Sequence, residues 1–120
     1  MRNYPIIFLN AEDNSIDETS NAFFMGQNVA GCFTVINSET SVGGTVQIQG
    51  SNDIPIGDPK SYVPAASSWV NITDATSTIT AGVADAIILP TISFQYLRCT
   101  FTNSSGGAGT ITVAGSFTSV

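Results

Sequence analysis

The sequence predicts one all-β domain, folded as a β-sandwich of the jelly-roll type with about eight antiparallel strands. Three observations predict this class. Apolar and polar residues alternate with a period of two in several short runs, turn-forming residues separate these runs, and helical periodicity is nearly absent. The chain has 120 residues, which is enough for one hydrophobic core, so we expect residues 1–120 to form a single domain.

The expected strands follow one another along the whole chain. The clearest alternation lies in residues 45–49, where Val46 and Ile48 point to one side and the polar residues around them point to the other. In chain order, the expected strands cover residues 4–9, 22–25, 29–36, 44–49, 68–72, 77–80, 86–89 with 93–101 following it, and 109–118.

Residues rich in Gly, Asn, Asp and Ser stand between these runs and predict turns. The turns are expected at residues 37–39, 43–44, 50–53, 73–74 and 103–107. A weak helix candidate covers residues 81–89.

The run from Phe94 to Phe101 predicts an internal strand. Leu97 and Cys99 belong to its apolar face, whereas Arg98 lies on the opposite face. A cation in the middle of so apolar a strand needs a partner. We therefore expect Arg98 to pair with a carboxylate or with backbone carbonyls, at a sheet edge or at a subunit contact.

Two stretches interrupt the strands and predict loops. Residues 10–21 contain four of the nine acidic residues, and residues 51–67 contain three prolines together with Lys60 and Tyr62. The second loop is longer than most connections, and loops of that length usually carry a contact or stay mobile.

Charge is scarce in this chain, which limits the functions that it can have. Charged residues make up 10% of the chain, the net charge is −6, and Ser and Thr together account for 28 of the 120 residues. Three basic residues cannot form the basic stripe that binds phosphates, so we expect no nucleic-acid partner. No segment approaches the roughly 18 apolar residues of a membrane span, so we expect no membrane partner either.

The composition also argues against catalysis. The chain has no histidine, and histidine is the commonest general base and a common zinc ligand. The serines lack an activating base, because the single lysine, Lys60, lies in the proline-rich loop. We therefore expect no enzymatic activity, no catalytic residue and no cofactor.

Glu12, Asp13, Asp17 and Glu18 are the best candidate metal ligands, because carboxylate oxygens on a flexible loop suit calcium. Their spacing is not that of an EF-hand loop. The plainer interpretation is a solvated acidic loop that binds no ion. The sequence leaves calcium binding open and assigns no metal ligand.

Cys32 and Cys99 lie far apart in the chain and fit neither a metal-binding nor a disulfide pattern. Cys99 alternates with Leu97 and Phe101 and should therefore point into the core, while the side on which Cys32 points is ambiguous. Two buried free thiols are the main interpretation. A Cys32–Cys99 bridge is the alternative.

Trp69 is the only tryptophan and has two interpretations. Its position beside Val70 favours packing in the core. The alternative is an aromatic platform at the rim of the sandwich, because exposed tryptophan and tyrosine hold sugars in carbohydrate-binding modules. In that case loops 51–67 and 102–109 would form a sugar site with Tyr62 or Trp69.

The first residues predict a protein made in the cytoplasm that keeps its native start. The apolar run at residues 6–9 is shorter than the core of a signal peptide. Residues 1–21, with Pro5, the apolar run and the acidic loop, are the expected arm that contacts neighbouring molecules.

Four segments together resemble a pattern in small β-sandwich proteins of tailed-phage virions. A strand ends in Ser-Asn-Asp at residues 44–53, a tryptophan strand follows at 69–72, and a Tyr-Leu-Arg strand at 94–98 precedes a glycine-rich hairpin that leads into 109–113. The resemblance covers roughly residues 44–115 and is a rhythm of strands, not a catalytic signature. It implies a decoration (cement) protein, a head fibre or spike base, or a tail accessory module.

The leading hypothesis is a non-enzymatic structural protein of a bacteriophage virion, which decorates and stabilises the assembled capsid. Its expected partners are the major capsid protein or other virion proteins, and its expected oligomer is a homotrimer at a symmetry axis. A protein that binds only the assembled lattice stabilises that lattice by mass action. One alternative is a glycan-binding module or adhesin, and another is a penton, spike-base or tail accessory protein.

Overall fold

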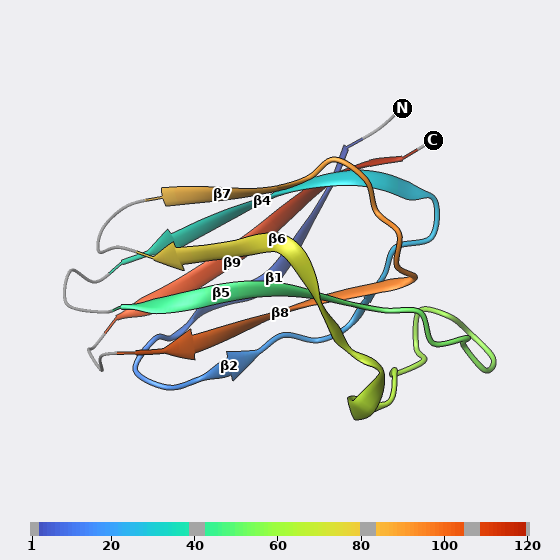
Figure 1. Ribbon diagram of the computed structural model, residues 1–120, viewed down its shortest axis with the longest axis horizontal. Coiled ribbons are helices and arrows are strands. Elements are labelled where there is room, and N and C mark those ends of the chain that lie inside the picture. Colours follow the sequence, from blue (N-terminus) through green and yellow to red (C-terminus); the bar gives the residue numbers. More distant parts are fainter. Residues whose placement is uncertain (1–2, 39–42, 80–83, 105–108, 120) are drawn as a thin grey trace.

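Two antiparallel sheets lie face to face and enclose the hydrophobic core (Figure 1). The computed structural model describes residues 3–38, 43–79, 84–104 and 109–119. Sheet A contains, in spatial order, β1 (Asn3–Asp13), β9 (Thr110–Ser119), β4 (Asn28–Asn37) and β7 (Ala84–Leu89). Sheet B contains β2 (Glu18–Thr19), β8 (Tyr96–Asn103), β5 (Gly44–Ser51) and β6 (Val70–Ile79), and β3 (Phe23–Phe24) also pairs with β8.

The strand order is that of a jelly roll. The short strands β2 and β3 pair with successive parts of β8 and together take the place of one interrupted strand. The chain changes sheet at every connection except those from β2 to β3 and from β5 to β6. An order β1-β9-β4-β7 that faces β2-β8-β5-β6 is produced by two Greek keys. The predicted class, an all-β sandwich of the jelly-roll type, is confirmed.

Alternation along the central strands supplies the core from both sheets. The residues that β4, β5, β8 and β9 contribute to the core cluster are Phe33, Val35, Val46, Ile48, Leu97, Cys99, Phe101, Ile111, Val113 and Phe117. Phe33 and Phe117 meet edge to face with ring centroids 5.5 Å apart, and Phe8 packs beside both. Such aromatic pairs stabilise the fold beyond the area that they bury.

Two glycines make room for the Phe117 ring. A Cβ atom at Gly31 or at Gly115 would lie 2.7 Å from carbons of that ring, which is closer than van der Waals contact allows. Glycine inside a strand is otherwise unfavourable. The close approach of Phe117 is therefore the reason for glycine at both positions.

Strand β6 corrects two of the predictions. Residues 70–72 and 77–79 of the segments expected at 68–72 and 77–80 belong to one strand, and the turn expected at 73–74 is a bulge within it. Residue 80 lies outside the described residues. Asp74 adopts a positive φ of 64° there. The sequence predicts a turn at this position because residues that tolerate positive φ serve both turns and bulges.

The side chain of Gln47 holds the bulge of β6 in place. Its amide nitrogen lies 3.1 Å from the carbonyl oxygens of both Ile72 and Ala75. Gln47 therefore satisfies carbonyl groups that the interrupted ladder leaves without a partner on β5.

Strand β1 is longer than predicted, and the helix candidate is wrong. Two irregularities in its register let β1 follow β9 as far as Asp13, so part of the loop expected at 10–21 is strand. Residues 84–89 form β7, while residues 81–83 lie outside the described residues, as does the predicted turn beyond Ser104. Helical structure in the described ranges is confined to η1 (Ala66–Ser68), and no helix there is long and apolar enough to cross a membrane.

Replacing Gly115 by alanine tests the packing of the Phe117 ring. The added Cβ must displace that ring, so G115A should lower the free energy of unfolding by about 1–3 kcal/mol in urea denaturation. Ser116→Ala, at the exposed neighbouring position, is the control and should change stability by less than about 0.5 kcal/mol. Equal stabilities of the two variants would contradict the close approach.

Asp85 ties the edge of sheet A to the edge of sheet B. The Ser77 hydroxyl on β6 and the Ala86 N–H both donate to the Asp85 carboxylate, and these bonds lower the Asp85 pKa, the Ser77 bond most. A carboxylate whose pKa is lower in the folded state than in the unfolded state stabilises the fold. This contribution is fully present at pH values above the unfolded-state pKa of about 3.9. That contribution is lost as the pH falls through the lower pKa of the folded state.

We therefore expect Asp85→Asn to lower the melting temperature at pH 7, and the difference from the wild type to shrink as the pH falls below about 4. Asp74→Asn is the matched control, because it removes the same charge from an exposed position of β6. A D85N deficit that stays constant with pH would refute the role of this carboxylate. Thermal unfolding at a series of pH values measures both.

Candidate functional site

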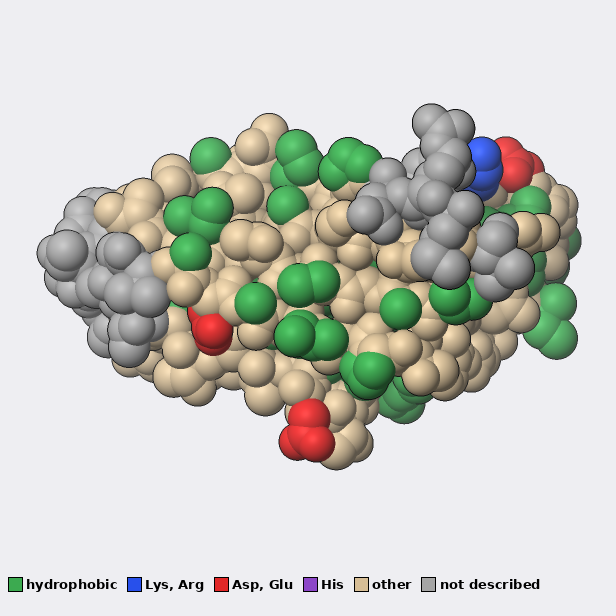
Figure 2. All heavy atoms as spheres, turned by 90° about the horizontal axis from the view of Figure 1, so that it is seen from above, with side chains coloured by type: hydrophobic (Ala, Val, Ile, Leu, Met, Phe, Trp, Pro, Cys, Tyr) green, Lys and Arg blue, Asp and Glu red, His purple; other side chains and the backbone are tan. Residues whose placement is uncertain are grey.

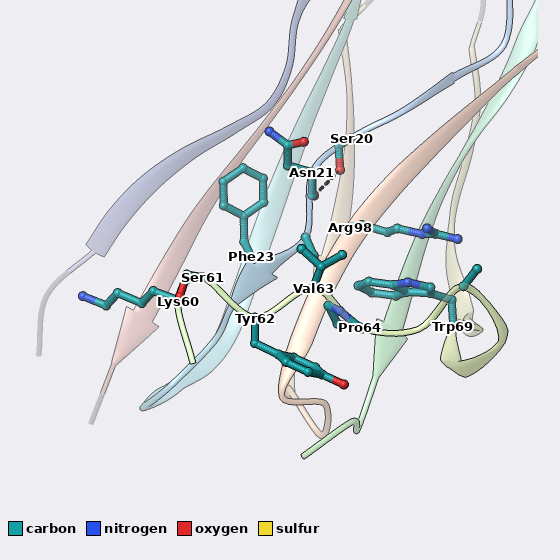
Figure 3. A pocket seen from close by; sticks show the side chains of 12 residues that line it. Ser20, Asn21, Phe23, Lys60, Ser61, Tyr62, Val63, Pro64, Trp69 and Arg98 are labelled. Carbon is teal, nitrogen blue, oxygen red and sulfur yellow. Dashed lines mark hydrogen bonds between the residues drawn. The ribbon is translucent and has the colours of Figure 1, made fainter. Parts of the chain in front are cut away.

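A cleft of about 690 Å³ lies on the outer side of sheet B. The loop between β5 and β6 forms one wall, and the segment between β2 and β3 forms the other (Figure 3). Phe23, Tyr62 and Trp69 line the cleft together with Lys60 and Arg98. Both basic residues that the structure describes therefore share one cleft, in a chain of net charge −6.

Hydrogen bonds hold the β5–β6 loop, residues 52–69, in its place on the sheet. The Tyr62 hydroxyl donates to the Asp53 carboxylate at 3.2 Å. The Tyr96 hydroxyl donates to the Pro59 carbonyl at 2.7 Å. Because Tyr96 is a buried residue of β8, this second bond fixes the wall of the cleft to a central strand.

Arg98, on β8, lies over the ring of Trp69. Its guanidinium carbon is 4.4 Å from the ring centroid, which is a cation–π contact. The Arg98 Nε donates at 2.7 Å to Gln49 Oε1, on the opposite position of β5. The Gln49 Nε2 in turn donates at 2.9 Å to Asn71 Oδ1 on β6. These side chains form one polar row across three strands.

The positions of Trp69 and Arg98 correct two predictions. Trp69 is half-buried at the outer surface and is not in the core, because it precedes β6 and is not bound by the alternation of that strand. Arg98 is not at a sheet edge, since β8 lies between β5 and the β2–β3 pair. Its partners in the described part of the chain are the Gln49 side-chain amide and the Trp69 ring, not a carboxylate or a backbone carbonyl. The expected subunit contact at Arg98 stays a prediction.

The sugar site considered from the sequence combined loops 51–67 and 102–109, and the structure separates them. Ser51 pairs with the start of β8, whereas Gly44 pairs with its end, so the two loops leave sheet B at opposite ends. Residues 20–23 form the second wall in place of loop 102–109. No periodic pattern marks these residues, because the strands beside them have only two residues each.

Burial changes the pKa values of three groups in and near the cleft. Desolvation lowers the pKa of Arg98. Desolvation, followed by the charge of Asp53, raises the pKa of Tyr62. Desolvation, followed by the effect of Tyr62, raises the pKa of Tyr96. Both phenols are therefore neutral hydrogen-bond donors at pH 7, while Arg98 keeps its charge because a guanidinium begins far above neutrality.

The hydroxyl of Ser20, at the rim of the cleft, already has two partners within the protein. It donates at 2.8 Å to the Asn21 carbonyl and accepts at 2.9 Å from the Cys99 N–H. An oxygen with these bonds is not poised as a nucleophile. The arrangement of aromatic surfaces, amides and fixed donors is suited to binding a ligand.

The four acidic residues of the calcium hypothesis do not converge. Asp13 accepts from the N–H and the hydroxyl of Ser15, at 2.9 and 2.7 Å, and these bonds lower its pKa. Asp17 accepts from a backbone N–H at the end of β8 at 2.8 Å, while Glu12 and Glu18 lie on separate strands. Among the described residues, no three Asp, Glu, His or Cys side chains are grouped so that they could hold a metal ion.

Both cysteines are free thiols, so the bridge alternative is wrong. Cys99 is buried in the core as predicted, and burial raises its pKa to about 12. Cys32 is exposed, which corrects the expectation of two buried thiols. It lies on β4, whose alternation directs Phe33 and Val35 inward and Cys32 outward.

The outer face of sheet A is free of charge across three rows of side chains. The antiparallel register aligns Pro5, Ser116, Cys32 and Ile88 in one row, Ile7, Ala114, Thr34 and Ala86 in the next, and Thr112, Ile36 and Ala84 in the third. Ile7, Ile36 and Ile88 are 54%, 48% and 69% exposed. We call these three rows the neutral face. Figure 2, seen from the β7 side, shows hydrophobic side chains along a surface with few charges.

Neither a family model nor a curated protein matches this sequence. Its fold does match solved structures. The PBSX exported protein XepA superposes with a TM-score of 0.64 at 15% identity, over 98% of this chain and 37% of that one. This chain therefore spans little more than a third of XepA.

Two further structures match over most of both chains. PirA superposes with a TM-score of 0.55 at 11% identity, over 98% of this chain and 94% of that one. The SPBc2 prophage-derived protein YomS superposes with a TM-score of 0.51 at 13% identity, over 96% and 91%. At these identities the likeness establishes the fold alone. The expected resemblance to β-sandwich proteins of phage origin is thus confirmed at the level of the fold.

The two thiols should differ sharply in reactivity. A maleimide reagent at pH 7 should modify Cys32 alone, because the Cys99 thiol is buried and its raised pKa suppresses the reactive thiolate. Intact mass measurement should show one label on the native wild type and none on Cys32→Ser. Both thiols should react after unfolding in denaturant. Rapid double labelling of the native protein would contradict the burial of Cys99.

Proposed function

We propose that this protein is a structural component of a phage virion, which binds the assembled capsid and stabilises it as a decoration protein. The neutral face carries this proposal. It presents three exposed isoleucines on a surface of Ala, Ser, Thr and Pro side chains without a charge. The cores of protein interfaces are depleted of charge in the same way.

The fold of the chain is compatible with this role, since it is shared with the phage-derived proteins XepA and YomS. Jelly rolls also occur in viral capsid domains. In the proposed mechanism the protein binds only to the assembled lattice and not to free capsid subunits. It therefore shifts the equilibrium toward the lattice.

The first strand supports a contact with neighbouring molecules. Residues 3–13 of the expected arm, 1–21, form β1 at an edge of sheet A, and Pro5 and Ile7 bring its outward side chains onto the neutral face. The exposed edge of a strand can pair with a further chain. We propose a homotrimer at a symmetry axis of the shell, made in the host cytoplasm and incorporated into the virion.

Native mass measurement, together with sedimentation with capsids, distinguishes this proposed function from the alternative functions. A trimer that sediments with empty capsids supports a decoration protein. A pentamer indicates a penton or spike base, and a protein that binds tails but not capsids indicates a tail accessory part. A monomer that binds glycans and does not sediment with capsids would remove the decoration function.

The neutral face is tested by placing a charge at its most exposed residue. Ile88→Glu should lower the amount of protein that sediments with capsids at least tenfold, because the charge must be desolvated at the interface. Ile54→Glu is the control, since Ile54 is 80% exposed on the β5–β6 loop and lies outside the neutral face. Binding to the capsid should also protect Cys32 from maleimide, because Cys32 lies on the neutral face. Equal capsid binding by both variants would exclude the neutral face as the contact.

A further inference from the structure

Arg98 is a half-buried cation without an ionic partner among the described residues. Its contacts there are the Gln49 amide and the Trp69 ring. The carboxylates of the adjacent loop have other partners, since Asp53 accepts from Tyr62 and Asp58 accepts from the Lys60 N–H. Partial burial of an uncompensated charge is unfavourable, so the cleft is complementary to an anion that the chain itself does not supply.

The hydrogen bonds of the polar row all run the same way, from Arg98 to Gln49 and from Gln49 to Asn71. A guanidinium only donates hydrogen bonds, so Gln49 must turn its oxygen toward Arg98 and its nitrogen toward Asn71. Asn71, which is exposed, then uses its oxygen to accept from Gln49, so its own amide N–H groups take no part in the bonds of this row. The row thus ends in donors on both sides, namely the terminal nitrogens of Arg98 and the amide nitrogen of Asn71.

The Arg98 fork is oriented for a planar anion. The Nε is occupied by Gln49 and the guanidinium carbon lies over the Trp69 ring, which leaves the two terminal nitrogens as a pair of donors. Such a fork binds a carboxylate with two hydrogen bonds. Cation–π contact and the Gln49 bond hold the fork in one orientation, which reduces the entropy lost on binding.

The remaining lining of the cleft favours a carbohydrate as the carrier of that anion. Tyr62 and Trp69 offer apolar ring surfaces, and Asn21, Ser61 and Lys60 contribute polar groups to other parts of the lining. Sugars bind through this combination of an aromatic contact with the C–H face of the ring and hydrogen bonds to the hydroxyls. The volume of about 690 Å³ lies within the range of small-ligand sites.

We infer that this cleft is a binding site for a saccharide that carries a carboxylate, with the carboxylate on the terminal nitrogens of Arg98. The sugar ring lies along Tyr62 and Trp69. The inference does not depend on the proposed function, because the cleft is on sheet B and the neutral face is on sheet A. A protein with both surfaces can hold a capsid with one sheet and an acidic glycan with the other.

Trp69 provides the measurement, because it is the only tryptophan in the chain and lines the cleft. The probes are an oligogalacturonate and the same oligosaccharide with its carboxylates converted to methyl esters. Titration of the acidic form should change the Trp69 fluorescence and saturate. The esterified form should bind at least tenfold more weakly, since it lacks the charge-assisted bonds.

Gln49→Glu is the most direct test of Arg98 as the anion-binding residue. It places a carboxylate on Arg98 from within the protein, which should preserve the fold and compete with the ligand. We expect at least tenfold weaker binding of the oligogalacturonate by Q49E. Arg98→Lys should also bind weakly, because it keeps the charge but loses the fork. Ile88→Glu adds the same charge on the opposite sheet and should bind the saccharide as the wild type does.

Selective binding of the acidic form, lost in Q49E and kept in I88E, supports the inference. Equal binding of the esterified form, undiminished binding by Q49E, or no saturable fluorescence change would overturn it. Preferential binding of a peptide with a free C-terminal carboxylate would also overturn it, in favour of a peptide site. The proposed function fails independently, since it predicts that I88E loses capsid binding and Q49E keeps it.

Discussion

The inward packing of Leu97, Cys99 and Phe101 is the constraint on which the rest of the structure depends. These residues hold β8 at the centre of sheet B, and because strand residues alternate, they direct Arg98 outward. A slip of one position would bury the guanidinium in the core, at a high cost in desolvation. The core therefore fixes the register of β8, and this register fixes the place of the cleft.

The outer faces of sheets A and B differ because the few charged side chains of this protein are unevenly distributed between them. Sheet B presents the amide row of Gln49 and Asn71 beside Arg98, with Lys60 in the loop above. Sheet A presents rows of apolar and hydroxyl side chains. A sandwich whose outer faces have such different chemistry can engage two unlike partners without competition between them.

The sequence predicts the parts of the fold that depend on local alternation, and fails where the structure depends on distant contacts. Val46 and Ile48 on β5 and Cys99 on β8 point inward as expected. The core position predicted for Trp69 is wrong because the prediction depends on the strand residues that follow it in sequence, whereas its position depends on a contact with Arg98 of β8. The sequence predicts a turn at Asp74 and not a bulge, because the side chain that completes the bulge, Gln47, lies on a different strand.

The central position of β8 and β9 has a consequence for how the protein is made. These two strands follow all others in the chain, yet each lies inside its sheet, between strands that are synthesised earlier. The sandwich therefore cannot close before β9 has been synthesised, and its earlier strands have unpaired edges until then. Pairings over such long separations form slowly, and exposed edges favour aggregation during the delay. Production of this protein should thus be more sensitive to chaperone supply and to translational pausing before β8 than to changes in its surface loops.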